Sequence, residues 1–393
     1  MDRMEPEDSM SYAGNSVSPP PILPGLRPQF HVIVKPGAIC NLDCTYCYYL
    51  HKKEELLGSE SRPRMSDEVL ETHIRQYIEG QRGDAVVFSW QGGGPTLLGV
   101  GLFEKVVALE KKYKRPNQRI ENDLQTNGTL LDESWCTFLR DNNFLVGLSI
   151  DGPKELYDRF RVDKNGRPTF EKTVTACQLL QKHKVPFSVL TVVSRVNARR
   201  PLDVYRFLTR DLSVRQLRFI PCVEPRTFKS TAPQKWDRAT LPMQDSPAAH
   251  PGNVDSVVTD WSVDPDDWGY FLCRVWDDWY QRDYGRVHVN LFENAVGQRM
   301  GKDSQLCVYS EFCGKAMALE HDSSVYSCDH YVYPEYKLGN ITQTHLCAVR
   351  LRMKTIGSAP DKKSSYRLAK KRDGCTMVSF SRLKRKFWLR RPL

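Results

Sequence analysis

Short apolar runs alternate with longer amphipathic stretches between residues 30 and 220. The runs are rich in β-branched and aromatic residues and end at polar turns, as buried strands do. They predict strands at 30–35, 85–90, 119–125, 144–150, 186–193 and 214–220. Helical periodicity predicts helices at about 66–81, 102–114, 132–141, 168–183 and 200–210, the first capped by Ser66. This alternation predicts an α/β fold with a parallel sheet, outer helices, and functional residues at the carboxyl ends of the strands.

The pattern changes on either side of this alternating region. Residues 1–27 are rich in Ser, Pro, Gly and acidic residues, which predicts a disordered arm. Residues 224–262 are polar and contain repeated prolines, which predicts a linker or insertion after a first domain over 28–223. A helix with several tryptophans is expected at Asp266–Asp283, and a hairpin with its turn at Asp322-Ser323 follows. We therefore expect a second region over 263–345.

The net charge of +10 comes from one end of the chain. Residues 348–393 contain fifteen Lys and Arg against two Asp, so this segment carries +13 and the rest about −3. A basic tail is thus expected over 346–393, while the nearly neutral body makes nucleic acid an unlikely partner. No segment has the layout of a signal peptide or the roughly 18–20 apolar residues of a membrane span. We expect a cytoplasmic protein with no membrane partner.

Three cysteines, Cys40, Cys44 and Cys47, follow the first predicted strand with the spacing C-x3-C-x2-C. Structural zinc takes four protein ligands, whereas grouped thiolates are also the usual ligands of iron–sulfur clusters. Three ligands from one loop, with no fourth nearby, favour a cluster with one open iron. Scattered cysteines elsewhere are better interpreted as buried thiols; these are Cys136, Cys177, Cys222 and Cys273.

Small or polar residues also follow the next three strands. These segments are Gln91–Thr96 with three successive glycines, Gln125–Gly128, and Ser149–Pro153 with Arg159 and Arg161 beyond. Glycines allow the backbone to approach a ligand closely, and their free N–H groups can bind a polar ligand. Each segment alone is also compatible with ordinary turn chemistry. Together they indicate a ligand site at the same edge as the three cysteines.

A second group of cysteines, Cys307, Cys313 and Cys328, flanks the predicted hairpin and precedes Asp329. Hairpins that end in cysteines commonly hold metal. An iron–sulfur cluster, a zinc ion with a fourth ligand from elsewhere, and isolated thiols all remain open for these three residues.

Taken together, these motifs resemble the radical S-adenosylmethionine superfamily, and within it the anaerobic sulfatase-maturating enzymes with a SPASM-type C-terminal domain. The resemblance covers residues 30–345 and rests on segments beyond the cysteine loop. These include Tyr46–Tyr49, Gln91–Gly93, Leu124–Leu130, Asp132–Trp135, Phe144–Pro153 and Cys328-Asp329. It implies a partial (β/α)6 TIM-like radical SAM barrel followed by a small, incomplete SPASM-type cluster domain.

The resemblance also implies the chemistry. Cys40, Cys44 and Cys47 would hold a [4Fe-4S] cluster whose open iron binds S-adenosyl-L-methionine, and Cys307, Cys313 and Cys328 an auxiliary [4Fe-4S] cluster. The S-adenosylmethionine site would be lined by Tyr46, Gly93, Ser149, Arg161 and Val223. Asp329 would be the general base in the oxidation of a Ser or Cys to Cα-formylglycine. The implied partners are a sulfatase polypeptide with a Ser/Cys-x-Pro-x-Arg motif and an electron donor such as flavodoxin or ferredoxin.

The sequence departs from the family pattern at two places. Gly94 stands where the family has a Glu that helps to hold the amino group of S-adenosylmethionine. Beyond Ile341 the cysteine-dense family segment is missing, and only Cys347 and Cys375 remain. We expect impaired activity if a frameshift near His345 replaced the native C-terminus; a genuine basic tail that binds nucleic acid or a partner is the other interpretation. Another radical SAM/SPASM peptide-modifying enzyme, and an inactive paralogue that binds or regulates a sulfatase, are the alternative functions.

Overall fold

The computed structural model describes residues 30–50, 64–81, 83–227, 242–243, 245–310 and 316–357. The predicted arm over 1–27, Cys313, and the part of the predicted basic tail beyond residue 357 lie outside these residues.

A single ten-stranded sheet organises the described part of the chain, with its strands in the order β10-β9-β8-β1-β2-β3-β4-β5-β6-β7. All pairs from β1 to β7 are parallel, and β8 also pairs with β1 in parallel. The β8–β9 and β9–β10 pairs are antiparallel. The strands are β1 (His31–Val34), β2 (Ala85–Trp90), β3 (Arg119–Thr126), β4 (Phe144–Ser149), β5 (Phe187–Val193), β6 (Gln216–Pro221), β7 (His288–Val289), β8 (Ala316–Leu319), β9 (Ser324–Tyr326) and β10 (Lys337–Asn340).

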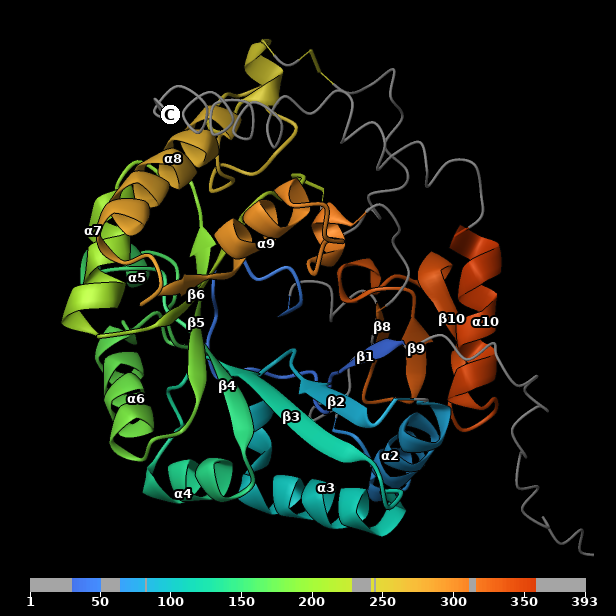
Figure 1. Cartoon of the computed structure of the whole chain (residues 1–393). Helices are drawn as coiled ribbons and strands as arrows, with labels where there is room; N and C mark the ends of the chain where they lie inside the picture. Colours follow the sequence, from blue (N-terminus) through green and yellow to red (C-terminus); the bar gives the residue numbers. More distant parts are fainter. Residues whose placement is uncertain are drawn as a thin grey trace, which may run out of the picture.

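Helices cover the convex outer face of this curved sheet (Figure 1). The α-helices are α2 (Asp67–Gly80), α3 (Val100–Tyr113), α4 (Glu133–Asp141), α5 (Lys154–Tyr157), α6 (Phe170–Lys182), α7 (Pro201–Arg206), α8 (Pro265–Arg282), α9 (Asn290–Arg299) and α10 (Leu346–Gly357). The first and last strands of the sheet do not pair with each other, so the barrel is partial. The predicted α/β fold with a partial barrel is confirmed.

The main core lies between the sheet and the outer helices. Phe88 and Trp90 of β2 are fully buried and make edge contacts with Tyr77 of α2 and Phe103 of α3. Because side chains alternate along a strand, the intervening Ser89 points to the concave inner face. The same alternation places alternate residues of the other strands inside the barrel, where a ligand can reach them.

Local signals explain where the helices begin. The Ser66 hydroxyl accepts a hydrogen bond of 3.2 Å from the Val69 amide at the start of α2, which confirms the predicted cap. Asp132 caps α4 in the same way through the Trp135 amide. Asp264 caps α8, whose first residue is Pro265, and proline is well suited to that position.

Two segments near the predicted domain boundaries pack on the barrel. The region expected to begin at 263 includes α8 and β7, yet Phe271 of α8 packs on Phe219 of β6, and β7 extends the sheet beside β6. The tail expected to begin at 346 starts instead with helix α10, in which Leu346 and Val349 are completely buried. They are buried because α10 packs against α2. The basic charge of this end of the chain does not predict that contact.

The predicted hairpin forms, but it does not stand apart from the barrel. β8 and β9 pair with Leu319 opposite Val325, around a turn where Ser323 adopts a φ of 69°. The parallel pairing of β8 with β1 then attaches the hairpin directly to the first strand of the barrel. Among the described residues, no helix is long and apolar enough to cross a membrane.

Candidate active site

The loop that carries Cys40, Cys44 and Cys47, called the cysteine loop from here on, follows β1 and is hydrogen-bonded to the segment after β4. The amide of Asp43 donates to the carbonyl of Val162 at 2.8 Å, and the amide of Thr45 donates to that of Phe160 at 3.2 Å. Leu42, which is 1% exposed, anchors the loop in the protein interior. The loop is therefore held at the carboxyl edge of the sheet, as the sequence predicts.

Amide groups surround two of the three sulfur atoms. Cys40 Sγ lies 3.4 Å from the Leu42 amide and 3.6 Å from Nδ2 of Asn127, the residue that follows β3. Cys47 Sγ accepts from the Leu50 amide at 3.4 Å. Donors of this kind compensate the negative charge of metal-bound thiolates and orient them.

Burial raises the pKa of the Cys44 thiol to about 12, although the nearby Arg161 opposes the shift. The pKa of Cys47 is also raised by burial, against hydrogen bonds from the Leu50 and Tyr49 amides. In the apoprotein these thiols are therefore protonated at neutral pH. Metal binding has to displace their protons.

The glycines after β2 pack directly on the cysteine loop. Gly93 has a φ of +61°, and a Cβ atom there would lie 2.6 Å from the Ile39 carbonyl oxygen. The Gly94 amide donates to the same carbonyl at 2.7 Å. A Cβ atom at Gly94 would lie 3.6 Å from Cys40 Sγ, so a side chain at position 94 would reach toward the cysteines.

Asp151, two residues beyond the end of β4, joins two of the predicted S-adenosylmethionine-site residues. Its Oδ2 accepts from the Tyr46 hydroxyl and, at 2.8 Å, from Nε of Arg161. Its Oδ1 accepts from Arg161 Nη2 at 3.2 Å and from the Val192 amide at 2.9 Å. Tyr46, Asp151 and Arg161 are all more than nine-tenths buried. Sequence reasoning identified Asp151 only as part of a turn motif and missed this central role.

Charge and burial act against each other in this trio. Burial alone would lower the pKa of Arg161, but the Asp151 charge and hydrogen bond, together with the charges of Tyr46 and Cys44, raise that pKa above its ordinary value. Burial is the main cause that raises the pKa of the Tyr46 hydroxyl. Tyr46 therefore stays neutral and Arg161 stays cationic.

The other predicted S-adenosylmethionine-site residues lie apart from this trio. Ser149 ends β4 and its hydroxyl accepts from Nε2 of Gln125 at 3.0 Å. Val223 follows β6 with 54% of its surface exposed. Both lie at the carboxyl edge of the sheet, but within the described part of the chain no hydrogen bond joins either of them to Tyr46 or Arg161.

Asp329 approaches the cysteine loop from the hairpin. Its Oδ2 lies 3.4 Å from the Tyr48 hydroxyl, and its Oδ1 lies 3.2 Å from Cys328 Sγ. The Tyr48 ring stacks on the His330 ring with 5.1 Å between centroids. Burial would raise the pKa of Asp329, but the charges of His330 and Lys35 and the hydrogen bond from Cys328 lower it below its ordinary value.

A buried lysine and a buried glutamate lie where the hairpin meets the cysteine loop. Lys35, 1% exposed at the end of β1, places its Nζ 4.1 Å from the centre of the Tyr49 ring. The Tyr49 hydroxyl donates to Oε2 of Glu320 at 2.8 Å. Burial raises the pKa of Glu320 to about 7, and Lys35 opposes this shift. No pattern in the sequence indicates that these residues meet, because Glu320 belongs to the predicted hairpin.

The second group of cysteines is described only in part. Cys307 is exposed, Cys328 is half-buried, and Cys313 lies outside the described residues. Cys347 lies on α10, where its Sγ would be only 2.7 Å from a Cβ atom added to Gly80 of α2. Cys347 therefore packs between these two outer helices.

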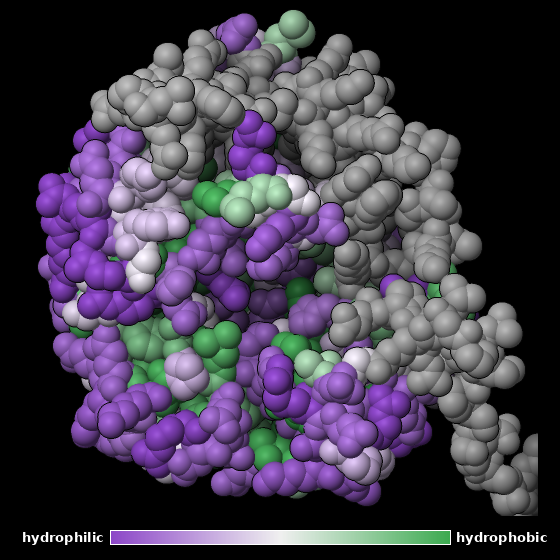
Figure 2. Space-filling model, in the orientation of Figure 1, coloured by the Kyte–Doolittle hydropathy of each residue, from purple (hydrophilic) through white to green (hydrophobic). Residues whose placement is uncertain are grey.

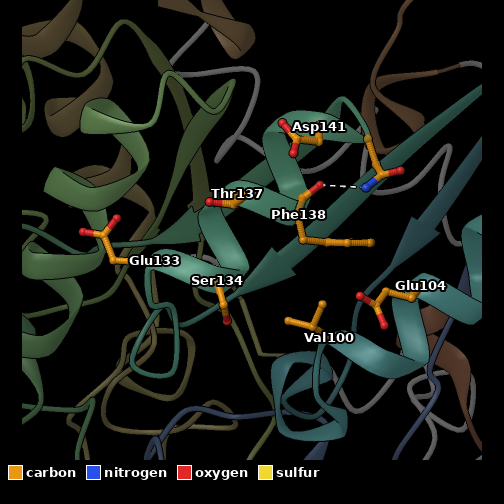
Figure 3. Close-up of a pocket in the computed structure, with 8 residues that line it drawn as sticks. Val100, Glu104, Glu133, Ser134, Thr137, Phe138 and Asp141 are labelled. Atoms are coloured by element: carbon orange, nitrogen blue, oxygen red, sulfur yellow. Dashed lines mark hydrogen bonds between the residues drawn. The ribbon is translucent and has the colours of Figure 1, made fainter.

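A groove of about 590 Å³ lies between α3 and α4 on the outer layer (Figure 3). Its lining includes Glu104, Glu133 and Asp141, but none of the predicted site residues. Glu133 also binds Lys182 of α6 at 2.6 Å. The groove is therefore a surface feature of the helical layer, separate from the site inside the sheet.

Two curated relatives resemble the chain over most of its length, and residues 34–208 match the Radical SAM superfamily. The serine-type anaerobic sulfatase-maturating enzyme of Bacteroides thetaiotaomicron is 40% identical over 312 residues, which are 79% of this chain and 72% of the relative. The cysteine-type enzyme of Clostridium perfringens is 36% identical over 318 residues, 80% of this chain and 78% of the relative.

Solved structures agree with these relatives. The enzyme anSMEcpe with bound AdoMet is similar with a TM-score of 0.68 and 35% identity, covering 82% of this chain and 80% of that one. The same enzyme with AdoMet and the Cp18Cys peptide has a TM-score of 0.68 and 33% identity, covering 86% and 82%. Streptococcus suis SuiB bound to its precursor peptide SuiA, at 12% identity and a TM-score of 0.56, shares the fold. This chain belongs to the anaerobic sulfatase-maturating enzymes of the radical SAM superfamily.

Proposed function

We propose that this protein oxidises a Ser or Cys side chain of a sulfatase to Cα-formylglycine under anaerobic conditions. The observation that carries the proposal is the meeting of Asp329 with Tyr48 of the cysteine loop, 3.4 Å apart. It brings a carboxylate of lowered pKa to the loop whose cysteines would hold the radical-generating cluster. Relatives of both the serine and the cysteine type support this substrate class.

Cys40, Cys44 and Cys47 fit a [4Fe-4S] cluster with one open iron. Among the residues described, no three His, Cys, Asp or Glu side chains converge on a single ion. A cluster presents a separate iron to each thiolate, so the three sulfurs need not meet at one point. The amides on Cys40 and Cys47 suit anionic sulfur. When bound, the cluster and S-adenosylmethionine supply a 5′-deoxyadenosyl radical that takes a hydrogen atom from Cβ of the target residue.

Tyr46, Gly93, Ser149, Arg161 and Val223 would bind S-adenosylmethionine. The Asp151 carboxylate accepts hydrogen bonds from Tyr46 and Arg161 and so fixes both side chains beside the cysteines. Gly93 lets the backbone lie against that loop. Val223 offers an exposed apolar surface, which would suit the adenine ring. Gly94 contributes no carboxylate, so the cofactor amino group has to rely on backbone groups and the open iron.

Asp329 would accept the proton of the substrate hydroxyl or thiol. A general base has to be ionised before it acts, and the nearby charges of His330 and Lys35 favour the carboxylate form. For a Ser target the complete reaction removes two hydrogens. One leaves as the hydrogen atom taken from Cβ, and the other as a proton to Asp329 together with one electron to an acceptor.

Cys307, Cys313 and Cys328 would hold an auxiliary [4Fe-4S] cluster that serves as this acceptor. A flavodoxin or ferredoxin would deliver the electron that starts the reaction, and we place the protein in the cytoplasm.

The domain division that we propose keeps the barrel as the radical-generating part and the region with β8 and β9 as the cluster-bearing part. It adds α8, β7 and α10 to the packed body.

Anaerobic reconstitution with iron and sulfide tests the proposal. The protein would be incubated with S-adenosylmethionine, a reductant and peptides containing Ser-x-Pro-x-Arg or Cys-x-Pro-x-Arg. We expect 5′-deoxyadenosine together with a formylglycine-containing peptide. Release of 5′-deoxyadenosine with a different mass change would indicate another peptide modification, and peptide binding without 5′-deoxyadenosine would indicate an inactive sulfatase-binding paralogue.

A further inference from the structure

Arg218 points into the barrel from the middle of β6. Its neighbours Leu217 and Phe219 are buried, and Phe219 contacts Phe271 of the outer helix α8 with ring centroids 5.2 Å apart. Arg218 and Ile220 therefore occupy the opposite, concave face. Both are exposed, Ile220 to 42%. The inner wall formed by β6 is thus open to a ligand, and Figure 2 shows a hollow in the middle of the molecule with hydrophilic residues around it.

The register of the sheet puts Arg218 in the same row as a predicted cofactor-site residue. Ser149 of β4 lies opposite Leu190 of β5, and Leu190 lies opposite Arg218. Residues opposite each other in a parallel sheet share one face. Arg218 is therefore at the level of Ser149, close to the edge that carries the cysteine loop.

Asp123 faces Arg218 from the other side of the interior. It lies on β3 opposite Ser89 of β2, whose hydroxyl donates to its carboxylate. Burial raises the pKa of Asp123, and the charges of His31 and Arg218 lower it. His31 of β1 in turn interacts electrostatically with both Asp123 and Asp329. The space between Asp123 and Arg218 thus adjoins the proposed base.

The two charges make this space suitable for a neutral polar ligand. The Arg218 guanidinium carries five N–H donors, yet it forms no hydrogen bond with any residue that the structure describes. Asp123 already interacts electrostatically with this guanidinium across the interior, so a second carboxylate gains less there than it would beside an isolated arginine. A peptide group, with its strongly hydrogen-bonding carbonyl oxygen, satisfies the free donors without adding charge.

We propose that Arg218 binds a backbone carbonyl oxygen of the substrate peptide and thereby sets how the target residue is presented to the cofactor and to Asp329. This inference rests on the proposed function, since it takes the sulfatase peptide as the ligand. Ile220, two positions along β6 on the same face, is exposed and provides an apolar surface beside the guanidinium, against which peptide side chains can pack.

Replacing Arg218 by Met tests the inference, because Met keeps an unbranched side chain and removes every donor. Binding of a fluorescent Ser-x-Pro-x-Arg peptide to the holoenzyme would be measured by anisotropy, along with KM and kcat for formylglycine formation. We expect affinity to fall tenfold or more, the usual effect of losing a hydrogen bond from a charged donor, with KM changing more than kcat. Arg218→Lys should restore part of the affinity. Arg215→Met, at an exposed position just before β6, is the matched control and should bind the peptide normally.

Peptides in which single backbone amides are replaced by esters identify the acceptor, because an ester carbonyl accepts hydrogen bonds weakly. One ester position should weaken binding to the wild-type protein but not to Arg218→Met. Equal peptide affinity in Arg218→Met and the wild type would overturn the inference, as would a loss that no ester position reproduces. If the wild-type protein binds no peptide and makes no formylglycine, the proposed function fails as well. If the wild-type protein makes formylglycine and Arg218→Met binds the peptide with unchanged affinity, only this inference fails.

Discussion

The hydroxyl of Tyr48 lies 3.4 Å from Oδ2 of Asp329, although 281 positions separate the two residues in the chain. Tyr48 directly follows Cys47, and Asp329 directly follows Cys328. The contact therefore joins the two cysteine-bearing segments. The parallel pairing of β8 with β1 makes it possible, because it sets the hairpin beside the strand that leads into the cysteine loop.

Replacing Asp329 by Asn should reduce formylglycine formation about 100-fold or more, the usual range for loss of a general base. Asn keeps the shape of the side chain but cannot accept the substrate proton. Exposed Glu335 in the same segment provides the matched control, and Glu335→Gln should retain activity. Product formed at the wild-type rate by Asp329→Asn would assign the base elsewhere.

Replacing Gly94 by Glu should tighten S-adenosylmethionine binding by roughly tenfold through a charge-assisted hydrogen bond to the amino group. The backbone at Gly94 has a φ of −122°, which other residues adopt readily. A Cβ atom there meets only the side-chain tip of Leu97 at 3.2 Å and Cys40 beyond 3.4 Å. Equilibrium dialysis with labelled cofactor would measure the change.

Gly94→Ala is the control for this gain and should bind the cofactor as the wild type does. Gly93→Ala should behave differently, because its Cβ would collide with two backbone carbonyl oxygens of the cysteine loop at 2.6 and 2.7 Å. We expect that variant to lose iron and stability. Unchanged cofactor affinity in Gly94→Glu would mean that position 94 does not face the amino group.

Replacing Asp151 by Asn should destabilise the fold by about 3–5 kcal/mol, because it leaves the buried Arg161 guanidinium without its counter-charge. Chemical denaturation of the apoprotein would measure the loss. Asp141→Asn is the control, since Asp141 pairs only with its exposed neighbour Arg140 and such pairs contribute little. A loss below about 1 kcal/mol in Asp151→Asn would show that water or another group compensates Arg161.

Glu110 makes the stability of the fold depend on pH. It lies 4% exposed on α3 and accepts from Nδ2 of Asn122 at 3.0 Å, and burial raises its pKa to about 8. The folded state therefore holds this proton more tightly than the unfolded state, so stability falls as pH rises from about 4.5 to about 8. Glu110→Gln should match the wild type near pH 4 and exceed it above pH 8 by on the order of 3–5 kcal/mol.

Thermal melting of the wild type and Glu110→Gln across this pH range measures the change. The same measurements on Glu104→Gln provide the comparison, because Glu104 is exposed on the same helix. Its stability difference from the wild type should stay constant across that pH range. If the stability difference between Glu110→Gln and the wild type does not change with pH, the buried carboxyl group ionises as it does in the unfolded chain.

The sequence predicted the barrel well because its signals are local. The strand expected at 85–90 is β2 to the residue, and the cap at Ser66 follows from one side chain and the next turn. The position of the cysteine loop was also predictable, since the loop directly follows the first strand. These features depend on neighbours within a few positions.

The missed features depend on contacts between distant segments. Asp151 resembled a turn residue, and only the folded chain brings Tyr46 and Arg161 to its carboxylate. Leu346 and Val349 lie next to a strongly basic stretch, yet they are buried against α2. The position of Lys35 beneath Tyr49, opposite Glu320, likewise requires the pairing of β8 with β1. Sequence periodicity carries no information on such pairings.

Replacing one cysteine of the cysteine loop tests the cofactor assignment separately. Cys44→Ala should lower the iron content of the reconstituted protein by about four atoms per chain and abolish release of 5′-deoxyadenosine. Cys273→Ala, on the outer helix α8, should retain both. Cleavage of S-adenosylmethionine by Cys44→Ala would count against the assignment of Cys40, Cys44 and Cys47 as cluster ligands.

The most direct measurement of the proposed function is the mass of a Ser-x-Pro-x-Arg peptide after anaerobic incubation with the reconstituted protein and S-adenosylmethionine. We predict that the peptide loses two hydrogens at the Ser residue, with formation of 5′-deoxyadenosine, and that Asp329→Asn suppresses this loss. An unchanged peptide mass for both the Ser and the Cys peptide, in a protein that contains its cluster and cleaves S-adenosylmethionine, would contradict the assignment of this chain as a formylglycine-generating enzyme.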